Sequence, residues 1–347
     1  MAGGTRGPAG GSDGLTVAIT GPTGDIGRAT VRALESSREI GRIIGMARRP
    51  FDPALHGWKR TEYRRGDVLE RDSVDDLVAE ADVVVHLAFL IFGSHDETRE
   101  INLQGSRNVF EATVAAGVKR LVYTSSVAAY GFHARNPDVL TEDVPPIGTR
   151  DFYYSAQKAE LEELLADVTA GSGAGVYVFR PCIVAGADAP TLIEGFTGQK
   201  IFGRRVRLLW RALDAVPLLG PVLPDSGVPF QLVHHDYVAN AVRAAVLGRG
   251  TPGTYNLAAD DAITVSDVAH SLGWHAVPLP RAAVGAVGGL VRRAPLLPAE
   301  AGWVDALRKP VLMDTAKARR ELRWRARRDA HETLAQTVEA AHAAGIV

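Results

Sequence analysis

The sequence predicts an α/β protein, built on a doubly wound parallel sheet with a smaller, mostly helical C-terminal lobe. In the first half, apolar runs of strand length alternate with segments of helical spacing, as in a parallel sheet covered on both faces. A glycine-rich turn joins the first apolar run to the first helical segment. Beyond residue 181 this alternation of strand and helix patterns is interrupted, and Leu, Trp and Pro occur among Arg residues. A chain of 347 residues is long enough for two unequal lobes.

The individual elements follow from the spacing of apolar residues. Residues 15–20 are a continuous apolar run and form the first strand. Residues 26–36 have helical spacing, so that Ile26, Val31 and Leu34 can share one buried face. From residue 264 onward the pattern is mostly helical. Further strands are predicted at residues 42–46, 83–88, 120–125, 230–233 and 254–257.

Composition excludes several classes of protein. Lys+Arg 39 against Asp+Glu 40 leaves a formal net charge of -1, which indicates no nucleic-acid partner. The one cysteine, Cys182, excludes a disulfide framework and a cysteine-based metal cluster, and it predicts a cytoplasmic protein. His234 and His235 are adjacent rather than spaced for one ion, so no metal is expected. The apolar residues 282–291 are too few for a membrane span, which needs about 20.

The turn after the first strand can hold the pyrophosphate of a dinucleotide. Its glycines stand at three-residue steps and let the backbone approach a phosphate, and the following helix offers N–H groups and a partial positive charge. A tight turn without a ligand is the alternative, and the strong flanking strand and helix favour the binding turn. The predicted contacts are Gly21, Thr23, Gly24, Asp25, Ile26 and Gly27.

The end of the second strand indicates which dinucleotide binds. An acidic residue there would bind the ribose hydroxyls of NAD. The sequence instead has Arg48 and Arg49, whose guanidinium groups suit a 2′-phosphate, so NADP(H) is favoured and NAD(H) is the alternative. The alternative is that both arginines are solvated loop residues. The next turn, with Asp67 and Val68, can accept a hydrogen bond from the adenine amino group.

A tyrosine and a lysine one helical turn apart can catalyse proton transfer. Tyr154 and Lys158 stand at i and i+4, on one face of a helix. The reference pKa of tyrosine is about 10, and the ammonium is expected to lower it toward the working range. Ser126, at the end of a preceding strand, is the expected donor to a substrate oxygen. Tyr153 is excluded because its i+4 partner is Gln157.

Together these residues resemble the extended short-chain dehydrogenase/reductase family, in its epimerase/dehydratase and 3β-hydroxysteroid dehydrogenase-like branch. The glycine turn, Ser126 and the Tyr154–Lys158 pair are similar to the family's motifs, and the resemblance runs over most of the chain. It implies that Asn102 is part of the catalytic site, in a supporting role. It also implies further cofactor contacts, from Leu87, Ala88, Pro181, Tyr154 and Lys158.

The chain is expected to divide into a tail and two lobes. Residues 1–14, rich in Gly and Ala, are expected to be a disordered tail. Residues 15–185 with 230–260 are expected to form a Rossmann domain that binds NAD(P). Residues 186–229 with 261–347 are expected to form the substrate-binding lobe. Family members are usually homodimers built on two helices per subunit, so a homodimer is expected.

Departures from the family pattern narrow the function. Val127-Ala128 stands where dehydratase members carry an Asp-Glu pair, so a sugar dehydratase is not expected. Gln231 lies in a segment without the arginine that meets the diphosphate of a nucleotide sugar, although arginines within residues 204–207 could substitute. The apolar residues 208–210 and 218–220 suit an apolar substrate, or they simply pack the small lobe.

The leading hypothesis is an NADP(H)-dependent oxidoreductase that reduces a ketone or oxidises a secondary alcohol on an apolar small molecule. Ser126, Tyr154 and Lys158 would carry the reaction. A nucleotide-sugar epimerase with retained NAD(P) is the alternative, because the same residues serve a transient oxidation. A non-catalytic NADP-binding regulator is the third hypothesis, and the presence of both Tyr154 and Lys158 disfavours it.

Overall fold

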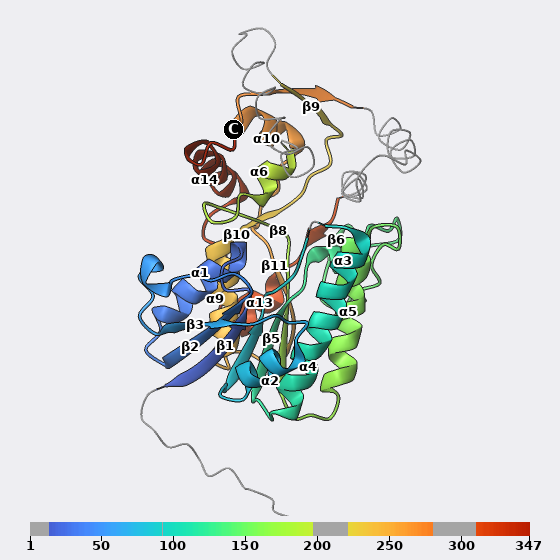
Figure 1. The fold of residues 1–347 in the computed structure, drawn as a ribbon. Coiled ribbons are helices and arrows are strands. Elements are labelled where there is room, and N and C mark those ends of the chain that lie inside the picture. The colour runs from blue at the N-terminus through green and yellow to red at the C-terminus, as the bar shows by residue number, and fades with distance from the viewer. Residues whose placement is uncertain (1–13, 92, 197–220, 280–309) are drawn as a thin grey trace, which may run out of the picture.

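The computed structural model describes residues 14–91, 93–196, 221–279 and 310–347. These residues form a larger lobe around a central sheet and a smaller lobe that lies above it in Figure 1. Several sequence predictions concern other residues and lie outside the described part of the chain, namely those for residues 1–13, 204–210, 218–220 and 282–291.

The central sheet of the larger lobe has the strand order β11-β7-β5-β4-β1-β2-β3, and every neighbouring pair is parallel. The winding reverses between β1 and β4, which makes the sheet doubly wound, and ligands of such sheets bind at this switch point. This confirms the predicted fold class. The strands are β1 (Leu15–Thr20), β2 (Ile40–Ala47), β3 (Thr61–Arg65), β4 (Val83–His86), β5 (Arg120–Thr124), β7 (Gly175–Pro181) and β11 (Gly253–Leu257).

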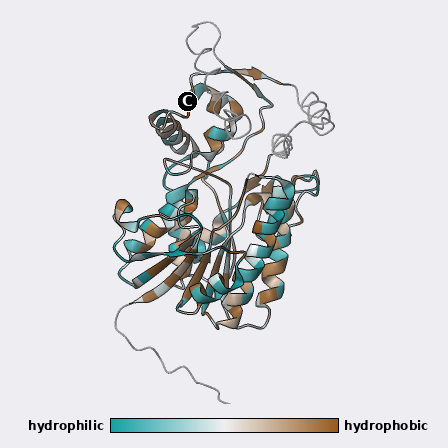
Figure 2. Ribbon diagram, in the orientation of Figure 1, coloured by the Kyte–Doolittle hydropathy of each residue, from teal (hydrophilic) through white to brown (hydrophobic). Residues whose placement is uncertain are grey.

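Helices cover both faces of this sheet. Along β1, Val17 and Ile19 point into one core and Ala18 into the other, because successive side chains of a strand face opposite sides. Figure 2 shows the strands in brown, between helices that carry teal on their outer sides. The first core is covered by α1 (Asp25–Glu35) and α9 (His235–Val246), and the second by α2 (Arg71–Val78), α4 (Gly105–Ala115) and α5 (Tyr153–Thr169).

The smaller lobe has its own apolar core, to which Leu192, Val268 and Leu334 contribute from three helices. Two short parallel strand pairs accompany these helices, β8 with β10 and β9 with β12. The elements of this lobe and its junction are β8 (Ile183–Ala185), α6 (Thr191–Phe196), β9 (Val222–Asp225), β10 (Leu232–His234), α10 (Val265–Ser271), β12 (His275–Pro278) and α14 (Ala330–Ala343).

Residues 312–324 return from the smaller lobe to the sheet. β13 (Leu312–Met313) pairs with β6 (Val139–Leu140), and α13 (Ala316–Glu321) contacts the edge strand β11. Trp324 joins the core of the sheet domain. The sequence division placed all of 261–347 in the substrate lobe. In the structure, residues 312–324 contact the sheet domain instead. β11 is the last strand of the sheet, and an edge strand is commonly covered by another segment of the chain.

Short helical turns connect the remaining elements. Among the described residues, no helix has both the length and the apolar character needed to cross a membrane. The turns are the 3-10 helix Pro53–His56, α3 (His95–Arg99), the π-helical turn Glu100–Gln104 and the 3-10 helix Val127–Tyr130.

Candidate active site

The glycine turn joins β1 to α1 at the carboxyl edge of the sheet. A Cβ added at Gly27 would lie 2.1 Å from the carbonyl oxygen of Gly21, so the fold itself requires glycine at this position. At Gly24 an added Cβ would meet that carbonyl at an ordinary 3.6 Å, and φ is an unstrained -74. The folded protein alone therefore does not require glycine at position 24. A ligand that approaches this backbone closely would require it, because it would meet an added Cβ.

The first turn of α1 is available to such a ligand. Gly24 is the N-cap and supplies no side-chain hydrogen bond to the helix, while Thr23 beside it is exposed. Asp25 and Ile26 are half-buried, and a carboxylate oxygen of Asp25 accepts a hydrogen bond of 2.5 Å from the hydroxyl of Thr191 in α6. Helix N-termini favour anions, so these residues fit the pyrophosphate of a dinucleotide.

Three arginines lie at neighbouring strand ends beside the turn. Arg48 and Arg49 directly follow β2 and are exposed. Arg65, the last residue of β3, is also exposed and lies opposite Ala47 of β2 in the strand register. Sequence reasoning missed Arg65, because only the pairing of β2 with β3 brings it beside Arg48. A 2′-phosphate at this edge would face guanidinium groups from both strands.

The acidic turn after β3 is held from the neighbouring helix α4. Asp67 accepts a hydrogen bond of 3.0 Å from the N–H of Leu69. The side-chain amide of Asn108 donates to the carbonyl oxygens of Val68 and Leu69, at 2.9 and 3.2 Å. Val68 is buried beneath Gly105, where an added Cβ would lie 2.5 Å from its Cγ2. The turn is therefore fixed at the same sheet edge as the glycine turn.

A buried histidine links β1 to α4 behind the glycine turn. Nδ1 of His86 is 2.7 Å from the Thr20 hydroxyl oxygen, and Nε2 is 2.8 Å from that of Ser106. Burial, and then the positive charge of Lys158, lower the pKa of His86 to about 3, so the ring is neutral. The Thr20 hydroxyl oxygen also accepts a hydrogen bond from the N–H of Ala88, at 3.3 Å. This series of hydrogen bonds fixes the backbone at the end of β4.

The other two strand-end residues expected at the cofactor are also held by the sheet. The N–H of Leu87 donates to the carbonyl oxygen of Thr20 at 3.1 Å. Pro181 is buried, ends β7 and lies opposite Leu257 of β11. Both residues therefore stand at the carboxyl ends of parallel strands, where ligands of doubly wound sheets bind.

Ser126, Tyr154 and Lys158 come together between the end of β5 and the start of α5. All three are buried, and the hydroxyl of Ser126 is hydrogen-bonded to that of Tyr154. Ser126 also caps the 3-10 helix that follows β5, because its Oγ accepts from the N–H of Ala128 at 3.1 Å. The strand end thus fixes the serine, and the first helical turn presents the phenol to it.

The expected lowering of the tyrosine pKa is wrong for this structure. Burial raises the pKa of Tyr154 above its ordinary value, and the hydrogen bond with Ser126 only partly opposes this. Nζ of Lys158 is 6.0 Å from the centroid of the Tyr154 ring, and it donates instead to the carbonyl oxygen of Thr124 at 3.0 Å. Burial lowers the pKa of Lys158 itself to about 7, although the negative charge of Glu162 partly opposes this.

The hydrogen bonds of Asn102 run to Leu90 and Gln157, and none of these reaches Ser126, Tyr154 or Lys158. Its Oδ1 accepts from the N–H of Leu90 at 2.7 Å, and its Nδ2 donates to the carbonyl oxygen of Leu90 at 2.9 Å and to Oε1 of Gln157 at 2.8 Å. Both amide hydrogens are therefore used. Asn102 lies in the π-helical turn, a distortion that often occurs at functional sites. It ties the loop after β4 to α5.

Tyr153, which sequence reasoning excluded as the catalytic tyrosine, is tied to the loop after β4. Its hydroxyl donates to the carbonyl oxygen of Ile91. Behind the site, Glu162 receives hydrogen bonds from the hydroxyl of Ser125 at 2.6 Å and from Nε of the buried Arg180 at 2.9 Å. The acidic partner of Lys158 is thus shared with a second cation.

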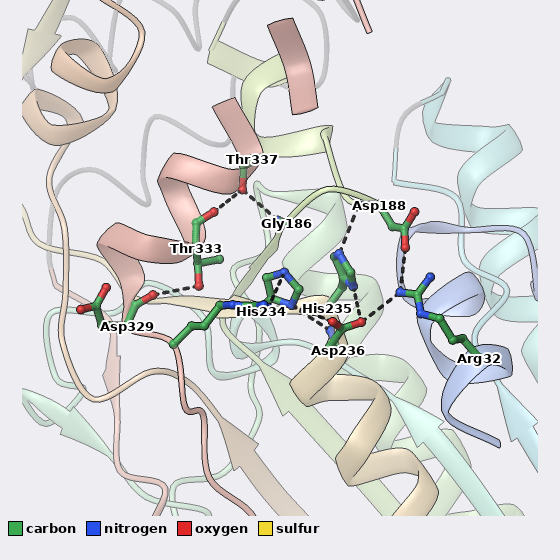
Figure 3. A network of polar contacts seen from close by, with 10 residues as sticks. Arg32, Gly186, Asp188, His234, His235, Asp236, Asp329, Thr333 and Thr337 are labelled. Carbon is green, nitrogen blue, oxygen red and sulfur yellow. Dashed lines mark hydrogen bonds and ion pairs between the residues drawn. The ribbon is translucent and has the colours of Figure 1, made fainter. Parts of the chain in front are cut away.

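A polar network joins the two lobes next to α1 (Figure 3). Arg32 of α1 pairs with Asp188, before α6, at 2.9 Å and with Asp236, at the start of α9, at 3.0 Å. The hydrogen bond with His235, and that with Arg32, hold the pKa of Asp236 well below its usual range. His234 lies beside this pair, and burial lowers its pKa to about 4.

The two histidines and Asp236 offer ligand atoms within 4.8 Å of one another. One ring nitrogen of each histidine accepts from a backbone N–H, because Asp236 donates to His234 Nδ1 at 3.2 Å and Asp188 donates to His235 Nε2 at 3.1 Å. Arg32 occupies the carboxylate. Through Arg32 and Asp188 this cluster connects α1 to the start of α9 and to the segment before α6.

Fold and site together define the class of the NAD(P)-dependent short-chain dehydrogenase/reductase enzymes, and comparison with known proteins agrees. The model of the "NAD dependent epimerase/dehydratase family" matches residues 17–258, and the chain belongs to this family. The match confirms the family that the sequence motifs indicated.

Two curated proteins and one solved structure illustrate the relationship. The chain is 30% identical to L-arabinose 1-dehydrogenase (NAD(P)(+)) of Haloferax volcanii over 239 residues, which cover 62% of this chain and 87% of the relative. It is 33% identical to human 3 beta-hydroxysteroid dehydrogenase type 7 over 222 residues, 58% of each protein. The structure of MoeE5 with UDP-glucuronic acid and NAD superimposes with a TM-score of 0.69 at 21% identity, covering 95% of this chain and 99% of that one, and shows a shared fold.

Proposed function

We propose that the protein is an NADP(H)-dependent oxidoreductase that interconverts a ketone and a secondary alcohol on an apolar small molecule. The observation that carries the proposal is the buried cluster of Ser126, Tyr154 and Lys158 at the carboxyl edge of the sheet. The two curated relatives named above, both dehydrogenases, support a net oxidation or reduction.

The cofactor would lie across the switch point between β1 and β4. The turn from Gly21 to Gly27 would hold the pyrophosphate, and Asp67 with Val68 would meet the adenine. Arg48 and Arg49, joined by Arg65 from β3, would bind the 2′-phosphate and thereby favour NADP(H). Ala88 and Pro181, with Leu87 beside them, would contact the nicotinamide half.

When bound, the nicotinamide supplies or accepts a hydride at the carbonyl carbon. Ser126 would donate a hydrogen bond to the substrate oxygen and orient it beside Tyr154. In reduction the phenol of Tyr154 donates its proton to that oxygen, and the raised pKa keeps this proton in place at neutral pH. In oxidation the phenolate takes the proton back. Lys158 would stabilise the phenolate and hold the nicotinamide ribose.

The side chains around Tyr154 support an apolar substrate. Phe89, Ile91 and Phe132 are partly buried and pack against an apolar cluster that includes Tyr154 and Phe152. Phe89 and Ile91 lie in the loop after β4, and Phe132 follows the 3-10 helix after β5, while Phe152 and Tyr154 lie at the start of α5. Sites lined mainly by such side chains bind apolar ligands and use few polar groups for orientation.

Two further details bear on the epimerase alternative. Gln231 is buried, and its amide is used within the protein: Nε2 donates to the carbonyl oxygen of Ala259 at 2.9 Å and Oε1 accepts from the N–H of Met313 at 2.7 Å. It is therefore not available to a nucleotide diphosphate. Ala128 is buried and cannot provide the acid of a dehydratase. These observations favour the oxidoreductase.

Three remaining proposals concern the molecule as a whole. Residues 186–229 with 261–347, apart from the segment that returns to the sheet, would bind the substrate. A homodimer built on two helices per subunit and a cytoplasmic location complete the proposal. Sedimentation equilibrium would test the homodimer, and a single monomeric species at micromolar concentration would contradict it.

The cofactor preference is tested by binding. We expect NADPH to bind more tightly than NADH, and the double variant Arg48→Ala/Arg49→Ala to lose roughly tenfold or more in NADPH affinity, since a hydrogen bond to a charged group contributes about 1.5–3 kcal/mol. NADH affinity should stay within about twofold. Calorimetric titration measures both. Equal losses for the two cofactors would contradict a 2′-phosphate site.

The reaction is tested with a panel of ketones, steroids and nucleotide sugars, followed at the nicotinamide absorbance. We expect NADPH consumption with an apolar ketone, and its loss by roughly 100-fold or more in Tyr154→Phe, with NADPH affinity retained. Tyr153→Phe is the matched control and should keep most of the turnover. Turnover that survives in Tyr154→Phe would overturn the mechanism, and release of tightly retained NAD(P) with nucleotide-sugar conversion would favour the epimerase.

A further inference from the structure

An aromatic ring covers the ammonium of the candidate active site. Nζ of Lys158 lies 3.7 Å from the centroid of the Phe89 ring, while its hydrogen bond runs to the carbonyl oxygen of Thr124 at 3.0 Å. Lys158 is only 3% exposed. An ammonium over a ring face is attracted by the ring quadrupole, and the attraction is strongest where water is excluded.

The backbone on both sides of Phe89 is fixed. The N–H of Ala88 donates to the Thr20 hydroxyl oxygen, and both backbone groups of Leu90 are bonded to the amide of Asn102. The Phe89 ring also meets the Tyr154 ring edge-on, with centroids 5.5 Å apart and an interplanar angle of 90°. One side chain thus contacts both members of the tyrosine–lysine pair.

Few other groups can stabilise the ammonium among the residues that the structure describes. From β5, the hydroxyl of Tyr123 is 3.5 Å from Nζ. On β4, His86 is neutral. On α5 itself, Glu162 favours the charged lysine, but it is shared with Arg180 of β7. Direct partners of this charge are thus the Thr124 carbonyl at 3.0 Å, the Tyr123 hydroxyl at 3.5 Å and the ring centroid of Phe89 at 3.7 Å.

We propose that Phe89 is a positioning residue of the Ser126–Tyr154–Lys158 site, whose ring face holds the Lys158 ammonium at the end of β5 and keeps it charged. This inference rests on the proposed function only in assigning Lys158 to proton transfer. A ring has two effects here, since it excludes water from the ammonium and it attracts the charge. A leucine keeps the first effect and lacks the second, and a tyrosine keeps both.

The experiment follows the titration of Lys158 directly, by the NMR signals of the lysine ε-carbons. The chain has six lysines, and Lys158→Met identifies the signal by its disappearance. We expect Phe89→Leu to lower the pKa of Lys158 by about one pH unit, a tenfold change in the equilibrium. Phe89→Tyr should restore the wild-type titration. Phe132→Leu, in the same apolar cluster, is the control and should leave the titration unchanged.

A Phe89→Leu protein that is folded by circular dichroism and titrates Lys158 as the wild type does would overturn the proposal. The same holds if Phe132→Leu shifts the titration equally. The pH profile of turnover gives an independent reading, and its alkaline limb should move down with Phe89→Leu. If the wild type reduces no ketone while the NMR titration shifts as expected, the proposed function fails and the role of Phe89 stands. If turnover is present and the titration does not move, the proposed function stands and the role of Phe89 fails.

Discussion

At the scale of single residues, the candidate site contains a buried lysine, Lys158, whose pKa is lowered. Burial places this pKa at about 7, whereas the pKa of Tyr154 is raised above 10, the usual value for tyrosine. Around neutrality the phenol therefore keeps its proton, and the ammonium is the group that changes charge. In the proposed reduction both groups act in their protonated forms, so the ammonium is lost first as the pH rises and the phenol proton only at higher pH.

We predict that ketone reduction falls as the pH rises above about 7. An ammonium is present below its pKa and lost above it, so its stabilising charge disappears on the alkaline side. Alcohol oxidation needs the phenolate and should instead rise with pH. Initial rates measured in both directions between about pH 6 and pH 10 check this. A reduction rate that is flat over this range would contradict it.

The residues of the candidate site divide into those that local sequence can indicate and those that it cannot. Tyr154 and Lys158 stand one helical turn apart, so their spacing alone places them on one face. The position of Phe89 over Lys158 depends on how the loop after β4 meets α5. Arg65 becomes relevant only through the β2–β3 register. The pKa of Tyr154 was predicted in the wrong direction because burial is a tertiary property.

At the scale of elements, the β1–α1 turn contains two glycines with different reasons to be glycine. We predict that Gly27→Ala destabilises the fold by about 1–3 kcal/mol, because its Cβ would lie 2.1 Å from the Gly21 carbonyl oxygen. Gly24→Ala should leave stability within about 0.5 kcal/mol, since its Cβ meets only ordinary contacts, and should weaken NADPH binding at least tenfold.

Urea unfolding and calorimetric titration on the two variants separate these effects. Each variant serves as the control for the other, because both add one methyl group to the same turn. A Gly24→Ala protein that binds NADPH as the wild type does would show that no phosphate approaches this backbone. A stable Gly27→Ala protein would contradict the close contact.

The elements that sequence predicts well are the ones buried on both faces. β1 and β4 are continuous apolar runs, and their starts were predicted to the residue. β3, with Thr-Glu-Tyr-Arg-Arg, was not delimited, because it is an edge strand whose side chains are largely polar. β6 and β13 have two residues each, too few for any periodic pattern.

At the scale of the whole molecule, Trp324 tests where the C-terminal segment belongs. It is buried in the core of the sheet domain, and its Nε1 donates to the carbonyl oxygen of Tyr237 in α9 at 2.7 Å. We predict that Trp324→Ala lowers the free energy of unfolding by about 3–5 kcal/mol and removes hydrogen-exchange protection in α9 and β11.

The control is Val277→Ala, an exposed position in the smaller lobe, which should change stability by no more than about 0.5 kcal/mol. Loss of protection confined to α10 and α14 in the Trp324 variant would contradict the placement. Sequence could not predict this return, because the pairing of β13 with β6 joins residues far apart in the chain.

The return of the C-terminal segment also sets when this protein can finish folding during its synthesis. A ribosome delivers β1 to β5 early, yet the strand at the outer edge of the sheet gains its covering helix only after residue 321 has emerged. Until then the nascent chain presents an open strand edge, a surface prone to association with other chains. Emergence of α13 from the ribosome is therefore the step that covers this edge of the sheet.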